Sequence, residues 1–408
     1  MISKHLKYFG RLNLLLLRSV LFAPSIFKKK KKILFVGQIH SPHFSSFFNF
    51  FLPSSVKKKC SFKFLKSYPV FPRKILNFKG YTIVDYIFEA ISTKKSDTYF
   101  SKLHNEGIAE NQIKLYRYNR LLKRFNPDIV WMHDLQSAGY LLENSLPKDL
   151  IICLTTYGND LYFYRNSKIH RDKIRLILSY VDFLHVETIR DRKIAVELGY
   201  RGRFFPIASA TLNLYNLEAS DLTFDKVKSI FLLVKGDDGI RTQNEDFYKF
   251  LLSNPDKLQY RDIVVFSSGE LDEYYAEKLR VLNINIVCLG SVLHRDLLEL
   301  IEKSKFFLSL TLSDGIANLV VESASLNCIP FITKHNGCTE LFSEDRLMRL
   351  ISVNLSFNDL DFNKIIHLEN NQELMLDVLS DLRGGINSYF SEDKQKLFSI
   401  FCQKNLID

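Results

Sequence analysis

Asp314, Gly315 and Glu322 have the residue types and the spacing to hold a ligand that carries both negative charge and hydroxyl groups. Asp314 and Gly315 immediately precede a predicted helix over about residues 316–326, and Glu322 lies within it. At about 100° per residue, Glu322 lies about 200° around this helix from the core residue Val320, so its carboxylate points away from the core. A carboxylate in that place can accept hydrogen bonds from the hydroxyl groups of a ribose.

The backbone at the start of this helix is expected to form an anion site. The helix follows a predicted strand over 306–312 and precedes another over 329–333, so the three elements form one βαβ unit. Ligands in open α/β sheets bind outside the carboxyl ends of the strands. The free N–H groups of Gly315, Ile316 and Ala317 would lie at that edge, where they and the helix dipole favour a phosphate.

Side chains at both ends of the helix predict its limits. Ser313 or Asp314 is expected to cap the first turn, because these residue types accept hydrogen bonds from the first free N–H groups of a helix. Asn327 is expected to end the helix in the left-handed conformation. The helix is therefore predicted to be short.

An acidic residue, a glycine, six further residues and a glutamate also form the signature of a known family. SDGIANLVVESASLNCIPFIT resembles the acidic-x7-Glu motif of the retaining GT-B glycosyltransferases of group 1 (glycosyltransferase family 4-like), whose usual form is S-E-G-(x6)-E-A-(x5)-P-V-I. The resemblance implies that Glu322 holds the ribose of a sugar nucleotide and that Asp314 stands beside the transferred sugar. Most members have Glu at the position of Asp314, and some carry SDG. The alternative is a solvated Glu322 and an Asp314 that only caps the helix.

The first half of the chain supplies candidates that match the same family. Gly37 ends a predicted parallel strand, His40 and His43 lie in the loop that follows, and His133 lies near the end of a strand predicted over 128–134. The resemblance implies that the loop after Gly37 faces the acceptor, with His40 and His43 in its wall. It also implies that His133 contacts the sugar and the donor phosphate. Structural roles for these histidines are the alternative.

The second half supplies two cations and a further carboxylate. Lys235 lies at the end of a strand predicted over 229–236, and Arg241 lies in the loop that follows. Cations in these places would stabilise the charge on a departing diphosphate. The family places an Arg/Lys pair here, and the loop that carries Glu340 resembles the family's loop that meets the nucleotide.

The composition agrees with a folded protein of two domains. The chain has 408 residues, 46% hydrophobic and 25% charged, and a formal net charge of +11. The positive charge implies an acidic partner: nucleic acid, anionic lipid or nucleotide phosphates. Six cysteines are scattered without metal-binding spacing, which predicts reduced thiols in a cytosolic protein and no structural zinc.

Residues 1–32 differ from the rest of the chain. An apolar stretch over 12–27 is interrupted by Arg18 and Pro24, and the five lysines of 28–32 follow it. The stretch is too short for a transmembrane helix, and no small-residue cleavage site of a signal peptide follows. We predict an interfacial helix with a polybasic patch on the inner face of the cytoplasmic membrane. A frayed N-terminal extension is the alternative.

These observations predict an α/β protein with the GT-B fold, in which two Rossmann-like domains face each other across a cleft. Four segments are expected: a membrane-associating segment (1–32), an acceptor domain (33–215), a nucleotide-sugar domain (228–385) and a closing helix (386–408). A hinge is expected over 211–227.

The resemblance implies transfer of a hexose, with retention, from a nucleotide-diphosphate sugar to a hydroxyl of a glycan or lipid-linked acceptor, in cell-surface polysaccharide or glycolipid synthesis. The resemblance implies neither a metal ion nor a cofactor. One alternative is a non-catalytic GT-B subunit that binds a partner transferase or a glycan. A nucleic-acid-binding protein is disfavoured, because the sequence has no recognisable binding module.

Overall fold

The computed structural model describes residues 30–37, 44, 47–48, 52–66, 109–145, 149–209, 228–237, 239, 241–342 and 345–407. The predicted acceptor-side residues His40 and His43, the predicted hinge over 211–227, and residues 1–29 of the predicted membrane segment lie outside these ranges. The predictions for them stay predictions.

The first sheet, sheet A, consists of six parallel strands in the order β2-β1-β3-β4-β5-β6. Its strands are β1 (Lys31–Gly37), β2 (Cys60–Lys66), β3 (Ile129–His133), β4 (Ile151–Thr155), β5 (Phe183–His185) and β6 (Arg203–Phe204). Most of these strands are near-continuous apolar runs, as expected for a parallel sheet that is covered on both faces. In β3 all five residues are buried.

The second sheet, sheet B, also consists of six parallel strands, in the order β12-β11-β10-β7-β8-β9. Its strands are β7 (Ile230–Lys235), β8 (Ile263–Phe266), β9 (Ile286–Leu289), β10 (Ser304–Ser309), β11 (Ile329–Thr333) and β12 (Ser352–Val353). When β7 to β12 are renumbered 1 to 6 and the sheet is followed from β9 to β12, the order is 3-2-1-4-5-6, which is that of the dinucleotide-binding Rossmann fold.

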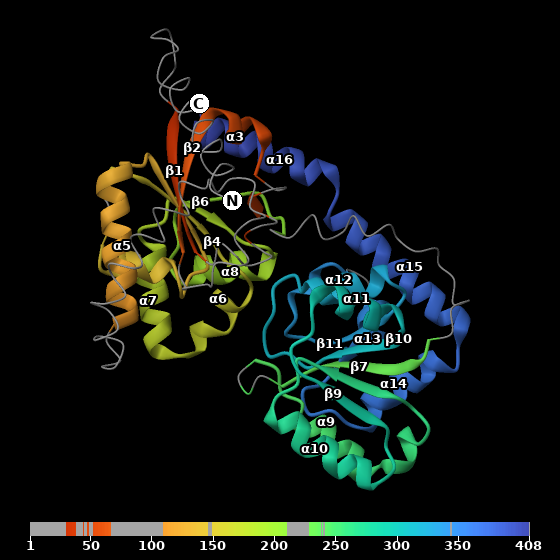
Figure 1. Cartoon of the computed structure of the whole chain (residues 1–408). Coiled ribbons are helices and arrows are strands. Elements are labelled where there is room, and N and C mark those ends of the chain that lie inside the picture. The colour runs from red at the N-terminus through yellow and green to blue at the C-terminus, as the bar shows by residue number, and fades with distance from the viewer. Residues whose placement is uncertain are drawn as a thin grey trace, which may run out of the picture.

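Helices cover both sheets, and each sheet forms its own lobe (Figure 1). The lobe of sheet A contains α3 (Ser54–Lys59), α5 (Ala109–Phe125), α6 (Asn159–Tyr162), α7 (Lys168–Leu178) and α8 (Ile189–Glu197). The lobe of sheet B contains α9 (Glu245–Ser253), α10 (Glu270–Val281), α11 (His294–Glu302), α12 (Asn318–Ser325), α13 (Asp345–Ile351), α14 (Asp359–Glu369) and α15 (Gln372–Tyr389). Among the described helices, none combines the length and the hydropathy needed to span a bilayer.

The end of the chain returns to the first lobe. After α15, the helix α16 (Glu392–Cys402) lies against the lobe of sheet A (Figure 1). Phe398 of α16 is fully buried, and its ring centroid lies 5.2 Å from that of Phe205 and 5.4 Å from that of His185. Burial of an aromatic side chain contributes about 1.5–3 kcal/mol to stability. Helix α16 therefore ties the two lobes together.

The helix at the acidic motif begins later than its sequence predicts. Helix α12 starts at Asn318 with Ala317 as its N-cap residue and without a side-chain cap, so the predicted cap by Ser313 or Asp314 is wrong. The reason is that Asp314 pairs with Asn336 in a parallel β-bridge and Ala317 has an extended backbone, so the helix cannot begin before Asn318. The predicted end is confirmed, because Asn327 has a φ of 60°.

Candidate functional site

Each sheet has one place where the strand order reverses. In sheet A this place lies between β1 and β3, which end at Gly37 and His133. In sheet B it lies between β7 and β10, which end at Lys235 and Ser309. Ligands of open α/β sheets bind at these switch points, outside the carboxyl ends of the strands. The predicted residues from both halves of the chain thus lie where the topology favours a ligand.

At the switch point of sheet B, the structure brings the predicted cations close to the acidic motif. The Nζ atom of Lys235 lies 3.7 Å from Oδ2 of Asp314, and both side chains are partly exposed. Arg241 is exposed, and its backbone carbonyl accepts a hydrogen bond of 2.6 Å from the N–H of Leu312, two residues before Asp314. Exposed ion pairs stabilise a fold by at most about 1 kcal/mol. The pair of Lys235 and Asp314 therefore adds little to the stability of the fold.

A buried carboxylate that the sequence did not point to fixes the loop after β7. Asp272, at the start of α10, is fully buried and accepts hydrogen bonds from the backbone N–H groups of Asp237 (2.9 Å) and Gly269 (2.8 Å) and from the hydroxyl of Tyr248. The side chain of Asn244 donates to Asp272 (3.3 Å) and to the carbonyl of Lys235 (2.8 Å). This network holds the backbone of the residues around Lys235 in one conformation.

Glu322 is buried on α12 beside the first residue of α11. It is 1% exposed, and its Oε1 atom lies 2.9 Å from Nε2 of His294, whose side chain is half exposed. Its Oε2 atom is buried and has no hydrogen-bond partner among the residues that the structure describes. Burial raises the pKa of Glu322, and the bond from His294 opposes that shift. The sequence predicted Glu322 but gave no signal for His294.

At the switch point of sheet A, His133 lies among aromatic rings. It is 1% exposed, and its ring centroid lies 4.4 Å from that of Phe47 and 4.7 Å from that of Phe44. Its Nδ1 atom lies 3.2 Å from the hydroxyl of Tyr157, and its Nε2 atom has no partner in the described part of the chain. Burial lowers the pKa of His133 well below its usual value, so the imidazole is neutral at pH 7.

Gly37 lies directly beside His133. A Cβ atom at position 37 would lie 2.6 Å from the carbonyl oxygen of His133, which is closer than a side chain can approach. A glycine is required there because two backbones meet. The structure therefore brings the first predicted acceptor-side residue next to the predicted sugar-binding histidine.

Three glycines bring the lobes into direct contact at this place. A Cβ atom at Gly158 would lie 2.0 Å from the backbone nitrogen of Gly315, and one at Gly337 would lie 3.0 Å from Cγ2 of Thr188 in the first lobe. Gly158 follows Tyr157, the partner of His133, and Gly315 follows Asp314, the partner of Lys235. The contact between Gly158 and Gly315 therefore connects the residues at the switch point of sheet A with those at the switch point of sheet B.

Residues just after β5 form hydrogen bonds with the predicted donor-binding residues. The carboxylate of Glu340 accepts from the backbone N–H groups of Ile189 and Arg190, both at 2.6 Å, in the first turn of α8. The guanidinium of Arg190 donates to the carbonyl oxygens of His335 (2.7 Å) and Asp314 (2.8 Å). These bonds link positions 124 to 151 residues apart, so the sequence alone gave no sign of them.

Two of the three N–H groups that were predicted to be free have partners within the protein. The N–H of Ile316 donates to Oε2 of Glu187 at 3.4 Å, and the N–H of Ala317 donates to the sulfur of Cys338 at 3.1 Å. The prediction of free N–H groups is therefore wrong for Ile316 and Ala317, because Ile316 lies against Glu187 of the first lobe and Ala317 against Cys338. Glu187, which is 3% exposed, was not among the predicted site residues.

Comparisons with known proteins identify the fold. No family model and no curated protein matches the chain. The solved structures that match include sucrose-phosphate synthase from Thermosynechococcus elongatus, with a TM-score of 0.63 and 8% identity over 92% of this chain and 99% of that chain. They also include the N-terminal domain of Candida albicans trehalose-6-phosphate phosphatase (TM-score 0.59, 14% identity, 94% and 98% covered) and Anabaena HepE in complex with UDP and glucose (0.53, 11%, 92% and 99%). The predicted α/β GT-B fold is confirmed.

Proposed function

We propose that the protein is a retaining glycosyltransferase that moves a hexose from a nucleotide-diphosphate sugar to a hydroxyl group of an acceptor. One observation carries the proposal: the contact between Gly158 and Gly315 joins the switch points of the two sheets. It places His133 on one side of the junction and the pair of Lys235 and Asp314 on the other. The structure of HepE with UDP and glucose has the same fold, which supports a nucleotide sugar as the donor.

The nucleoside half of the donor would be held by Glu322. Its Oε2 atom is a buried acceptor without a partner among the described residues, and such an atom destabilises a fold by about 1–3 kcal/mol. A ribose hydroxyl would donate to it and remove that penalty. His294, on the other oxygen, would keep the carboxylate in place.

The diphosphate would lie at the start of the acidic motif. Lys235 and Arg241 are the cations at this edge of sheet B, and the N–H groups of Gly315 and Ile316 add partial positive charge. These groups would stabilise the charge that develops as the diphosphate departs. They supply positive charge themselves, so we propose that transfer needs no metal ion and is insensitive to a chelator.

The sugar would lie between Asp314 and His133. Because burial keeps the imidazole of His133 neutral, it would orient the sugar through hydrogen bonds and would not contribute a positive charge. The acceptor hydroxyl would enter from the side of Gly37, followed in sequence by His40 and His43. Glu340 would meet the nucleotide only after its bonds to α8 are released.

A glycan or lipid-linked acceptor and a peripheral membrane location complete the proposal, and the distribution of charge supports them. Residues 1–84 contain 17 Lys or Arg and no Asp or Glu, while the remaining residues contain 39 Lys or Arg and 45 Asp or Glu. The whole net positive charge of the chain therefore comes from its first fifth, because the remaining residues carry more acidic than basic side chains. Such a segment is attracted to anionic lipid.

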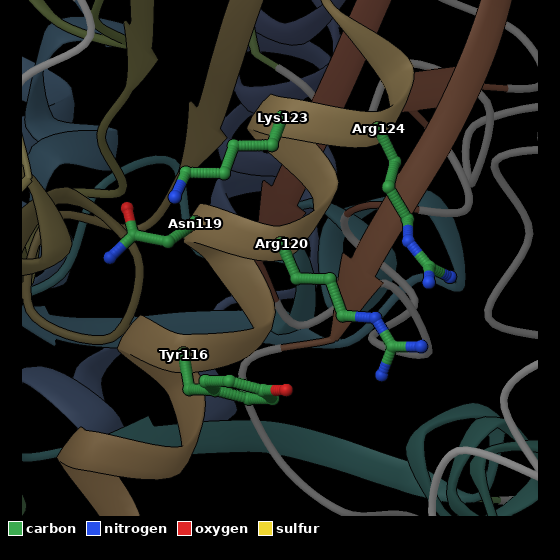
Figure 2. Close-up of a pocket in the computed structure, with 5 residues that line it drawn as sticks. All are labelled: Tyr116, Asn119, Arg120, Lys123 and Arg124. Carbon is green, nitrogen blue, oxygen red and sulfur yellow. The ribbon is translucent and has the colours of Figure 1, made fainter.

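Helix α5, in the lobe of sheet A, has a hollow lined by basic side chains. The hollow has a volume of about 450 Å³. Its lining residues are Tyr116, Asn119, Arg120, Lys123 and Arg124. Figure 2 shows Arg120 and Arg124 on one side of the helix and Lys123 on the other. Lys32 lies close by, because its Nζ atom donates to the carbonyl of Phe125 at 3.1 Å.

A non-catalytic GT-B subunit is the second candidate. It is favoured by the bonds that Ile316 and Glu340 make to the first lobe, since both residues are then engaged without a ligand. Donor turnover distinguishes the two functions. A subunit would bind a partner or a glycan but would not release nucleoside diphosphate from any donor.

A screen of nucleotide sugars by thermal unfolding tests the proposal first. A ligand at 100 times its dissociation constant stabilises the folded state by about 2.7 kcal/mol, which raises the unfolding temperature measurably. The donor that stabilises the protein is then incubated with acceptors, and NMR of the product gives the anomeric configuration. Glu322→Gln is the matched control, because it keeps the shape of the side chain. If no donor is bound or turned over, the proposal is wrong.

A further inference from the structure

We infer that Glu187 is a further residue of the donor site, where its carboxylate occupies the place of the diphosphate until the donor displaces it. This inference rests on the proposed function, which puts the diphosphate beside Gly315 and Ile316. Glu187 lies two residues after the end of β5 and is 3% exposed. It is therefore a buried carboxylate at the junction of the two lobes.

The two oxygens of Glu187 have different surroundings. Oε1 accepts a hydrogen bond of 3.1 Å from the hydroxyl of Ser209, in the same lobe. Oε2 faces the other lobe, where it accepts from the N–H of Ile316 at 3.4 Å. A Cβ atom at Gly315 would lie within 2.4 Å of this oxygen, so only a glycine leaves room for it. Oε2 thus contacts the backbone at which a phosphate oxygen of the donor is expected.

Two buried donor groups next to this backbone indicate that the site is made for a larger anion. The hydroxyl of Ser313 and the Nδ2 atom of Asn336 are buried and have no hydrogen-bond partner among the described residues. Asn336 is paired with Asp314 in a β-bridge, and its Oδ1 atom accepts from the N–H of Cys338 at 2.9 Å. Buried donors without partners are rare in folded proteins. A diphosphate carries several acceptor oxygens, whereas Glu187 offers one at this place.

Glu187 and a phosphate cannot occupy this place together. Two negative charges at one buried N–H group repel each other strongly, since the surroundings screen them poorly. Glu187 must therefore move away from the N–H of Ile316 when the donor binds.

Inorganic pyrophosphate is the probe that tests this inference, because it has no base or ribose. Its affinity is measured by calorimetry for the wild-type chain, Glu187→Gln and Glu322→Gln, each shown by circular dichroism to be folded. Glu187→Gln removes the competing charge but keeps the size of the side chain and an oxygen for Ser209. We expect it to bind pyrophosphate about tenfold more tightly than the wild type, on the scale of one charge-assisted hydrogen bond. Glu322→Gln should bind it as the wild type does.

A second variant alters the contact at Gly315 without changing the charge of the protein. Gly158→Ala puts a methyl group against Gly315 and separates the lobes there, so it should also bind pyrophosphate more tightly. If Glu187→Gln binds pyrophosphate no better than the wild type, the inference is overturned, whatever the result for Gly158→Ala. Loss of sugar transfer in Glu187→Gln without tighter binding would also overturn it, because Glu187 would then act in the reaction itself.

Nucleoside diphosphates separate this inference from the proposed function. UDP, GDP, ADP and dTDP are titrated into the same variants. If Glu187→Gln tightens the binding of pyrophosphate but no nucleoside diphosphate binds to any variant, the inference stands and the proposed donor is wrong. If a nucleoside diphosphate binds and Glu187→Gln does not tighten it, the proposed function stands and the inference is wrong.

Discussion

Replacing Gly158 with alanine should slow sugar transfer by keeping the two lobes apart. The new methyl carbon would lie 2.0 Å from the backbone nitrogen of Gly315 and 2.5 Å from the carbonyl carbon of Asp314, whereas ordinary contacts begin at 3.4 Å. Both neighbours are backbone atoms and cannot turn aside. The lobes must therefore separate locally by about 1.4 Å.

A displacement of this size is large for a reaction that needs groups from both lobes. A misplacement of about 1 Å in a reacting group can lower a rate about 100-fold, and we expect a loss of that order in the rate of transfer. The same shift would lengthen the two 2.6 Å bonds that Glu340 accepts from Ile189 and Arg190 beyond hydrogen-bonding distance. Those two amide protons should then exchange with solvent faster.

Gly290→Ala is the matched control, because a Cβ atom at Gly290 meets nothing within 4 Å. The assays are the initial rate of transfer with the preferred donor and hydrogen exchange at the amides of Ile189 and Arg190. We expect the control to behave like the wild type in both. If Gly158→Ala matched the control in rate and in exchange, the contact between the lobes would have no part in catalysis.

The remaining predictions concern single groups of the site. Lys235→Ala should lower kcat more than it weakens donor binding, since the charge of Lys235 matters most as the diphosphate departs. Steady-state kinetics measure kcat and KM, and a change in KM alone would contradict the prediction. His294→Ala should raise the pKa of Glu322 further, so that on lowering the pH Glu322 gains a proton, and nucleotide binding weakens, at a higher pH than in the wild type. His294→Gln should restore the wild-type dependence on pH. Calorimetry between pH 5 and 8 measures nucleotide binding to the three proteins, and identical pH profiles would refute the prediction. Deletion of residues 1–32 should reduce co-sedimentation with anionic vesicles, and salt should weaken the binding of the full chain; equal binding of both proteins would rule out the membrane segment.

Local sequence pattern predicted the strands and the residues at their ends. Apolar runs such as those of β1 and β7 are long enough and bounded clearly enough to be assigned, and the carboxyl end of each strand follows from its direction. Parallel strands put those ends at one edge, which is why Lys235 and Asp314 could be expected to lie together.

Contacts between distant segments could not be predicted in this way. Phe44 and Phe47 enclose His133, although they precede it by more than 80 residues, and nothing near His133 in sequence indicates that they do so. The bond from Ile316 to Glu187 likewise depends on how the lobes meet. The start of α12 was misplaced for a related reason, since its preceding residues pair with Asn336 and do not continue the helix.

A crystal structure of the protein soaked with its preferred nucleoside diphosphate tests the central claim most directly. We predict that a ribose hydroxyl lies within hydrogen-bonding distance of Oε2 of Glu322. The diphosphate should lie beside Lys235 and the N–H of Ile316, with Glu187 moved away from that N–H group. A nucleotide bound elsewhere, for example in the basic hollow of α5, would contradict the site and the function proposed for it.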